Sequence, residues 1–218
     1  MEFDELENRL NALDVSCLCD MDRTLPVMSD RLKPINPGLK LIGKARTVSC
    51  CDDFLTVIKG LAESKPGEVL VIDAGGGRKA LAGELFSAEA KRRGLAGIII
   101  DGACRDSRSI KEMGIPVWCT SFNPMAGTAQ KIEKTQIAIT CAGVQVAPGD
   151  IIFGDSDGII AAKQSRLEAL LEAAEKLKQR EDMVLKQIKE GKSLIELLNF
   201  EEHFSAVAGG GASKLRFQ

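Results

Sequence analysis

The chain has 218 residues, enough for one large domain with a continuous core, and its 44% hydrophobic content is typical of a folded globular protein. A net charge of −2 and an isoelectric point near 5.6 give no basic surface for nucleic acid, and no apolar run reaches the roughly 18 residues of a membrane helix. We therefore expect no nucleic-acid partner and no membrane attachment. The acidic N-terminus lacks the layout of a signal peptide, so the expected location is the cytoplasm.

Strand-like and helix-like segments alternate through the first 120 residues. In chain order, the predicted elements are a helix over 1–14, a strand within 39–49, a helix over 54–63, a strand over 69–72, a helix over 81–93, a strand over 98–100, a helix over 107–113 and a strand over 115–119. We expect Asp101-Gly102 to end the strand over 98–100. This succession with short connections is typical of parallel strands joined by helices that pack on a sheet, which predicts an α/β fold.

The C-terminal part changes character after two further short strands, predicted over 151–153 and 159–162. From Arg166 to about Phe200 the composition is helical and charged, with Gly191 as the expected break. We therefore expect an α/β core over 1–163 and a C-terminal helical arm with a flexible tail over 164–218.

Histidine and cysteine usage limits the chemistry. The single histidine, His203, argues against a His-rich zinc site and against a Ser-His-acid triad. The seven cysteines include no C-x-x-C pair, and their odd number is typical of reduced thiols. Adjacent Cys50 and Cys51 should point to opposite faces of a strand, and we assign them no chemistry.

A glycine-rich loop follows the strand over 69–72. Gly75-x-Gly77-x-x-Ala80 matches a relaxed dinucleotide-binding fingerprint, but roughly a third of the chain precedes it and no acidic residue closes the next strand at the usual spacing. We favour a tight turn over a dinucleotide site.

A cation and a carboxylate stand side by side after the strand over 98–100, at Arg105-Asp106. Ligands of α/β sheets gather at such strand ends. The alternative is that Asp106 is only the N-cap of the helix over 107–113, a role that aspartate often fills. For Asp155 and Asp157, in a glycine-flanked segment, a turn is the favoured interpretation.

Several short motifs, taken together, resemble the RraA-like family, which includes the class II 4-hydroxy-4-methyl-2-oxoglutarate/4-carboxy-4-hydroxy-2-oxoadipate aldolases. The resemblance covers residues 14–163. Its motifs are Gly43-Lys-Ala-Arg-Thr-Val, Gly83-Glu84-Leu85, Gly97 to Asp106, Gly114-Ile-Pro-Val, Pro148-Gly-Asp150 and Gly154 to Gly158. The aldolases carry an Asp-x20-Arg-Asp pattern, and here Glu84 stands in place of its first Asp. The resemblance implies a fold similar to the swivelling phosphohistidine domain, and homotrimers that sometimes pair into hexamers.

The resemblance also implies site roles that agree with the chemistry of the residues. Asp106 would hold Mg²⁺ or Mn²⁺, which prefer oxygen ligands, and Arg105 would stabilise the enolate of pyruvate. Glu84 would hold a metal-bound water. The backbone amides of Gly83, Glu84, Leu85 and Phe86 open a helix and would bind a substrate carboxylate.

A further site residue is expected from the helical arm. Glu181 lies on an apolar stripe formed by Leu170, Ala174, Leu177, Val184 and Ile188. The family places a C-terminal acidic residue near the metal of a neighbouring subunit, and Glu181 is the candidate. The alternative is a tolerated charge at the rim of the stripe.

These observations predict a divalent-metal-dependent class II aldolase. It would cleave 4-hydroxy-2-oxo diacids to release pyruvate, and it would also decarboxylate oxaloacetate, because both reactions pass through pyruvate enolate. The competing hypothesis is a non-catalytic member of the family that binds a ribonuclease or another protein. Retention of Arg105-Asp106 favours the enzyme.

Overall fold

The structure of the protein is a computed structural model that describes residues 1–217. The chain forms two compact units, a first unit of Met1–Leu171 and a second that begins at Glu172. This division lies inside a long helix, whereas the sequence analysis placed the boundary before that helix, after residue 163.

Helices and strands alternate through most of the first unit. The strands are β1 (Lys33–Pro34), β2 (Leu41–Ser49), β3 (Glu68–Asp73), β4 (Ala80–Ala82), β5 (Gly97–Cys104), β6 (Val117–Phe122), β7 (Lys134–Thr135), β8 (Ile139–Cys141), β9 (Val144–Val146), β10 (Ile151–Gly154) and β11 (Ile159–Ala162). The helices are α1 (Phe3–Asn11), α2 (Val15–Met21), α3 (Leu55–Glu63), α4 (Glu84–Arg92), α5 (Ser107–Met113), α6 (Gln164–Lys189) and α7 (Phe200–Ala208).

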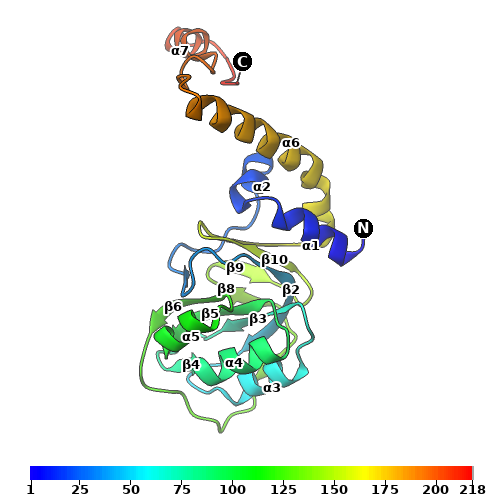
Figure 1. The fold of residues 1–218 in the computed structure, drawn as a ribbon. Coiled ribbons are helices and arrows are strands. Elements are labelled where there is room, and N and C mark those ends of the chain that lie inside the picture. Colours follow the sequence, from blue (N-terminus) through cyan, green and yellow to red (C-terminus); the bar gives the residue numbers. More distant parts are fainter. Residues whose placement is uncertain (218) are drawn as a thin grey trace. The chain divides into compact units, whose positions relative to one another are not determined.

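The large sheet has the strand order β1-β6-β5-β3-β2-β10-β11, with β4 paired to β5 and β7 paired to β2. Figure 1 shows the central strands β6, β5, β3 and β2 in this order. Its centre is parallel, because β2, β3, β5 and β6 run in one direction. The flanking strands β1 and β10 are antiparallel to their neighbours. Parallel neighbours need crossover connections, which α3, α4 and α5 provide. The predicted α/β fold is confirmed.

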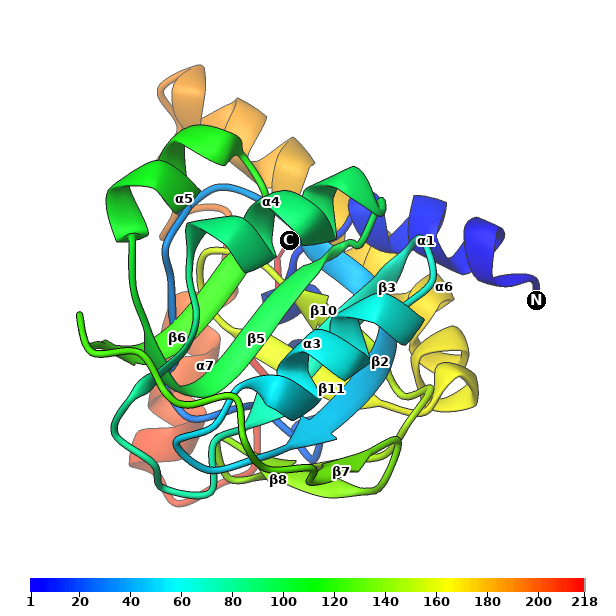
Figure 2. The same ribbon diagram turned by 90° about the horizontal axis from the view of Figure 1, so that it is seen from below.

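The three crossover helices lie over one face of the sheet, as Figure 2 shows. The apolar run Ile98-Ile99-Ile100 explains why the sheet is buried on both faces. Ile98 and Ile100 pack into the core beneath the helices, whereas Ile99 packs into a second core on the opposite face, near the β8–β9 hairpin.

The helix predicted over 1–14 is confirmed as α1, which ends at Asn11. The second helix, α2, was not predicted, and it begins where the Asp155 carboxylate accepts a hydrogen bond from the Val15 amide at 2.7 Å. Two local predictions are wrong. Leu81 lies in β4 instead of a helix. Asp101-Gly102 does not end β5, which continues to Cys104 because its last residues pair with both β4 and β6.

The C-terminal helical region is divided. The helix predicted from Arg166 to about Phe200 ends at Lys189 as α6, and Gly191 follows with a φ of +97°, so the predicted break is confirmed. Buried Asn199 precedes α7 and joins the chain end to the unit, since its side chain donates to the Lys214 carbonyl at 3.2 Å and accepts from the Arg216 amide at 2.8 Å.

All seven cysteines are free thiols, as predicted. Cys50 is buried and Cys51 is exposed, but both follow β2, which ends at Ser49, so they do not lie in the expected strand. Burial raises the pKa of the Cys50 and Cys104 thiols to about 12. Such thiols are protonated at neutral pH and do not act as nucleophiles.

Candidate active site

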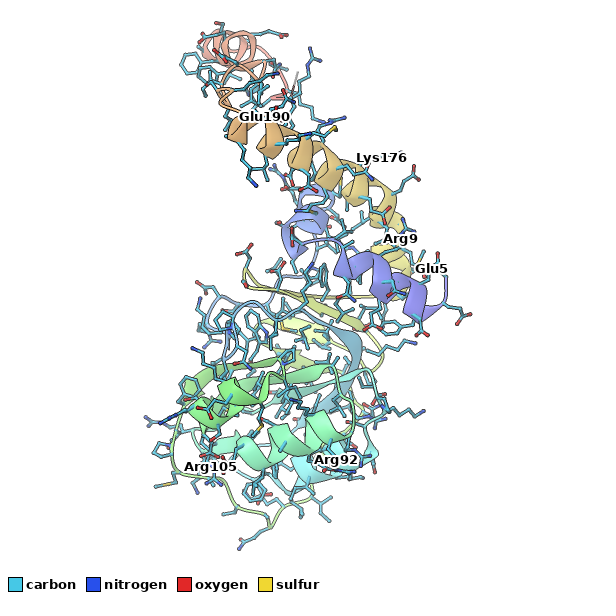
Figure 3. The ribbon with its side chains drawn as sticks, in the orientation of Figure 1. Glu5, Arg9, Arg92, Arg105, Lys176 and Glu190 are labelled. Carbon is cyan, nitrogen blue, oxygen red and sulfur yellow. The ribbon has the colours of Figure 1, made fainter. Side chains whose placement is uncertain are left out.

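The pairing of β4 with β5 brings the predicted site residues together. Ala82 lies opposite Cys104, and the Arg105 amide donates to the Ala82 carbonyl at 3.1 Å. The residues that follow each strand, Gly83 on one side and Arg105-Asp106 on the other, therefore lie next to each other. Figure 3 shows Arg105 at one end of α4, with Arg92 at the other. The carboxyl ends of strands are where α/β folds place ligand sites.

Gly83 is needed because the two charged side chains approach its backbone closely. A Cβ atom at this position would lie 2.5 Å from Oδ2 of Asp106 and 2.9 Å from Cγ of Arg105. The glycine itself has an extended backbone, with a φ of −162°, so its role is to leave room and not to provide unusual torsion angles.

Replacing Gly83 with alanine is therefore a steric test of the site. We expect Gly83→Ala to lower activity by roughly ten- to a hundredfold, because small displacements of reacting groups have effects of this size. The melting temperature should change little, because alanine adopts the extended backbone without strain. The matched control is Gly158→Ala, where the nearest atom to an added Cβ lies 4.0 Å away. Equal effects of the two variants on activity would contradict this role of Gly83.

Asp106 occupies the N-cap position of α5, but its carboxylate accepts no capping hydrogen bond from the described backbone amides of that helix. Oδ2 accepts a hydrogen bond from the Glu84 amide, at the start of α4, at 3.2 Å. The same oxygen lies 3.4 Å from Nε of Arg105. Asp106 also has a left-handed backbone with a φ of 56°, a conformation that is uncommon outside glycine and is concentrated at functional sites. The simple N-cap alternative therefore does not account for this side chain.

A cavity of about 200 Å³ opens beside these residues. Its lining includes most of the predicted site, namely Gly83, Leu85, Phe86, Arg105 and Asp106. Glu84 is not among the described residues that line the cavity. Its backbone amide is used in the hydrogen bond to Oδ2 of Asp106.

Sequence reasoning missed the other half of the lining. These residues are Phe54, Ala80, Leu81, Ala82 and Ala126. The ring of Phe54 packs edge-on against Phe86 at 5.7 Å, and the Phe54 amide donates to the carbonyl of Thr128. The three alanines carry no chemical signal in the sequence, so only the fold identifies them.

The glycine-rich loop is occupied by the chain itself. The amides of Arg78 and Lys79 both donate to Oδ1 of Asp52, at 2.8 and 2.7 Å, and these bonds lower the pKa of that carboxyl. The Gly77 amide donates to the Ala74 carbonyl. A carboxylate thus takes the donors that a phosphate would need, and α4 starts only after β4. This geometry supports the tight turn and argues against a dinucleotide site.

Asp53 fixes the segment that carries Ala126 and Thr128. Burial would raise the pKa of this carboxyl, but hydrogen bonds from the Thr128 hydroxyl at 2.6 Å and from the amides of Gln130 and Leu55 outweigh it and lower the pKa to about 2. Because Phe54 follows directly, Asp53 also holds one wall of the cavity in place.

We expect Asp53→Asn to lower the melting temperature by several degrees at neutral pH, because asparagine cannot accept all of these hydrogen bonds. The folded-state pKa lies below the ordinary value of 3.8, so the ionised carboxylate stabilises the fold above about pH 4, and this contribution is lost as the pH falls toward 2. Melting temperatures measured from pH 6 to 2 should therefore converge for the two proteins. A constant difference over this range would contradict the assignment.

The donor set suits a hard divalent cation with several bound waters. The described residues contain no cluster of three or more His, Cys, Asp or Glu side chains that could enclose a metal. Asp106 is a single carboxylate whose side chain is 35% exposed. Mg²⁺ binds in this way, through one or two carboxylates with water and substrate oxygens as further ligands. The residues present therefore fit Mg²⁺ or Mn²⁺ and do not fit zinc.

Glu181 belongs to the second unit, on the part of α6 beyond Leu171, and its side chain is half-buried. The cavity belongs entirely to the first unit. The predicted role of Glu181 at a neighbouring subunit's metal therefore stays a prediction.

Comparison with known proteins relates this chain to the RraA-like family by both a family model and an individual relative. The family model described as RraA-like, Aldolase/RraA, matches residues 15–161. A protein of Halalkalibacterium halodurans with the name "Putative 4-hydroxy-4-methyl-2-oxoglutarate aldolase" is 35% identical over 176 residues, which cover 80% of this chain and 83% of that protein.

Two solved structures are also similar. RraAS2 of Streptomyces coelicolor, described as an unusual member of the RNase ES inhibitor RraA protein family, aligns with a TM-score of 0.72 and 28% identity over 82% of this chain and 94% of that chain. The RNA-processing inhibitor RraA of Thermus thermophilis aligns with a TM-score of 0.63 and 27% identity over 67% and 90%. Proteins described as aldolases and proteins described as inhibitors of RNA processing are thus both similar to this chain. The function therefore has to be argued from the site and not from the fold. In the described part of the chain, no helix is long and apolar enough to cross a bilayer.

Proposed function

Because the chain belongs to the RraA-like family and keeps Arg105-Asp106 at a cavity, we propose that it is a metal-dependent carbon–carbon lyase that releases pyruvate from 4-hydroxy-2-oxo acids. The 4-hydroxy-2-oxo diacids are the substrates that the name of the Halalkalibacterium relative indicates. Oxaloacetate decarboxylation is the linked activity. The observation that carries the proposal is the convergence of Arg105, Asp106 and the start of α4 on one cavity.

The residues of this chain have distinct tasks in that reaction. Arg105 donates hydrogen bonds to the 2-oxo group and stabilises the negative charge that develops on its oxygen when the C3–C4 bond breaks. The amides of Leu85 and Phe86, in the first turn of α4, face no intrahelical acceptor and suit the C1 carboxylate. Asp106 would hold the divalent cation, which when bound supplies Lewis-acid polarisation of the 2-oxo acid.

The proton of the C4 hydroxyl must leave as C4 becomes a carbonyl. We assign to Glu84, the first residue of α4, the water that accepts this proton. The electron pair of the broken C3–C4 bond enters the enolate, and protonation at C3 completes pyruvate.

The first test is pyruvate release from oxaloacetate by the purified protein. We expect turnover with Mg²⁺ or Mn²⁺ and none after treatment with EDTA, with activity restored by added metal. Absence of metal-dependent turnover on both oxaloacetate and 4-hydroxy-4-methyl-2-oxoglutarate would overturn the proposal that this protein is an enzyme. A folded, inactive protein that inhibits a ribonuclease would instead support the regulatory alternative, which the two solved relatives represent.

We further propose that the active form is an oligomer, a homotrimer or hexamer, in which Glu181 reaches a neighbouring subunit's site. Glu181→Gln should then lower kcat by about tenfold or more without lowering the melting temperature, since removal of a half-buried carboxylate from an apolar stripe does not weaken packing. A structural ion pair would give the opposite result, lower stability with unchanged kcat. Both quantities are measured on the same oligomeric preparation.

A further inference from the structure

The candidate active site is built where three segments of the chain meet. β4 leads into Gly83 and α4, the end of β5 leads into Arg105-Asp106, and the segment after β6 supplies Ala126 to the cavity wall. Non-covalent contacts fix these segments relative to one another. Because the groups of the site come from different segments, its geometry depends on the contacts that hold the segments in register.

Asn123, the first residue after β6, makes hydrogen bonds to each of these segments. Its backbone amide donates to the Cys104 carbonyl at 3.0 Å, at the end of β5. Its Nδ2 donates to the Arg78 carbonyl at 2.8 Å, just before β4. Its Oδ1 accepts from the Met125 amide at 2.9 Å, next to the wall residue Ala126. One half-buried residue therefore joins the segments that form the site.

The side chain of Asn123 uses both of its hydrogen-bonding functions. Its NH2 group faces a carbonyl oxygen and its Oδ1 faces an N–H group, so an ionised aspartate, which has no donor, could not make both bonds. The peptide that it holds is also bound from the other side, because the amides of Arg78 and Lys79 donate to Asp52. The chain before β4 is thus fixed on two sides, and Asn123 also links it to the end of β5.

We propose that Asn123 is a positioning residue of the lyase, which holds β4 in register with the end of β5 so that the start of α4 faces Arg105-Asp106. The inference rests on the proposed function and adds a residue to it. Among the described residues Asn123 does not line the cavity, so it acts through the segments that it joins. Loss of its side-chain bonds would let Gly83 shift relative to Arg105, and small displacements of this kind lower reaction rates steeply.

Asn123→Asp tests this role with a side chain of the same size. Aspartate can still accept from the Met125 amide, but its second oxygen would face the Arg78 carbonyl oxygen and repel it. We expect kcat for oxaloacetate to fall about tenfold or more. The Mg²⁺ concentration that gives half-maximal activity should not change, because the carboxylate of Asp106 is intact. A lower melting temperature with unchanged kcat per folded protein would show a merely structural role and reject the inference.

The matched control is Gln145→Glu, the same exchange of an amide for a carboxylate. Gln145 is exposed in β9, and its Nε2 donates to the Thr140 hydroxyl at 2.5 Å within the β8–β9 hairpin. This hairpin packs on the face of the sheet opposite to the crossover helices, and the described cavity lining includes none of its residues. The control should keep the wild-type kcat. Equal losses in the two variants would indicate a general charge effect and would also reject the inference.

Hydrogen exchange provides a readout that does not depend on catalysis. The amides of Ala80 and Arg105 make hydrogen bonds between the joined segments, at 2.9 and 3.1 Å. Peptides of the full-length protein that contain these amides should exchange about tenfold faster in Asn123→Asp than in the wild type, because local opening becomes easier. Peptides from the centre of β3 should exchange at the wild-type rate. Unchanged exchange at both amides would overturn the role of Asn123.

The wild-type assay separates this inference from the proposed function. Absence of metal-dependent turnover in the wild-type protein would reject the lyase and, with it, the positioning role. Wild-type turnover that Asn123→Asp retains in full would reject the positioning role alone and leave the lyase in place.

Discussion

Asp106→Asn is expected to lower kcat for pyruvate release on the order of a thousandfold, equivalent to about 4 kcal/mol of transition-state stabilisation. Asparagine keeps an oxygen that can accept the Glu84 amide and also tolerates the left-handed backbone at this position, but it removes the negative charge that a divalent cation requires. The fold should therefore survive the substitution while metal-dependent activity is lost.

The measurement combines kcat, the melting temperature and the Mg²⁺ concentration that gives half-maximal activity. We expect an unchanged melting temperature and little or no metal-dependent rate. If the carboxylate of Asp106 only joins α5 to α4, asparagine would serve nearly as well, and near wild-type rates would show that the catalytic centre lies elsewhere.

Arg105→Lys is expected to lower kcat by about a hundredfold, the usual effect of removing a donor to a developing oxyanion. Lysine keeps the charge but lacks the planar fork of the guanidinium group, which can bind two oxygens at once. The side chain of Arg105 is 42% exposed, so the substitution should not disturb the core.

The matched control is Arg108→Lys, at the second residue of α5, where the arginine side chain is 93% exposed and its described ion pair is with Glu112, one turn further along the helix. This variant should retain the wild-type rate. Similar losses in the two variants would indicate a general charge effect and would contradict a specific role for Arg105.

The central part of the fold could be predicted because its signals are local. The triple isoleucine of β5 and the helix over 107–113 follow from apolar runs and glycine breaks within a few residues. The position of Arg105-Asp106 after a strand could be predicted for the same reason. The family resemblance then supplied the roles that spacing alone could not assign.

The rest of the site depends on contacts distant in sequence. Ala80–Ala82 has no strand signal, because alanine has a low strand propensity, and it becomes β4 only through pairing with the end of β5. Phe54 and Ala126 reach the same cavity from segments that hydrogen bonds to Asp53 hold together. Such pairings depend on the folded whole and leave no periodic pattern in the sequence.

The register shift in β5 has a consequence for how this site can diverge. The pairing of β5 with β6 shifts between Ile100 and Ala103, and an added Cβ at Gly102 would lie 2.4 Å from the Cβ of Ala74. Successive strand residues face opposite sides, so inserting or deleting one residue here would turn the last residues of β5 to the other face and displace Arg105 and Asp106, which follow them, from the cavity. Relatives with altered chemistry should therefore differ from this chain by substitutions around a β5 of constant length, and their length changes should accumulate outside the β4–β5 pair.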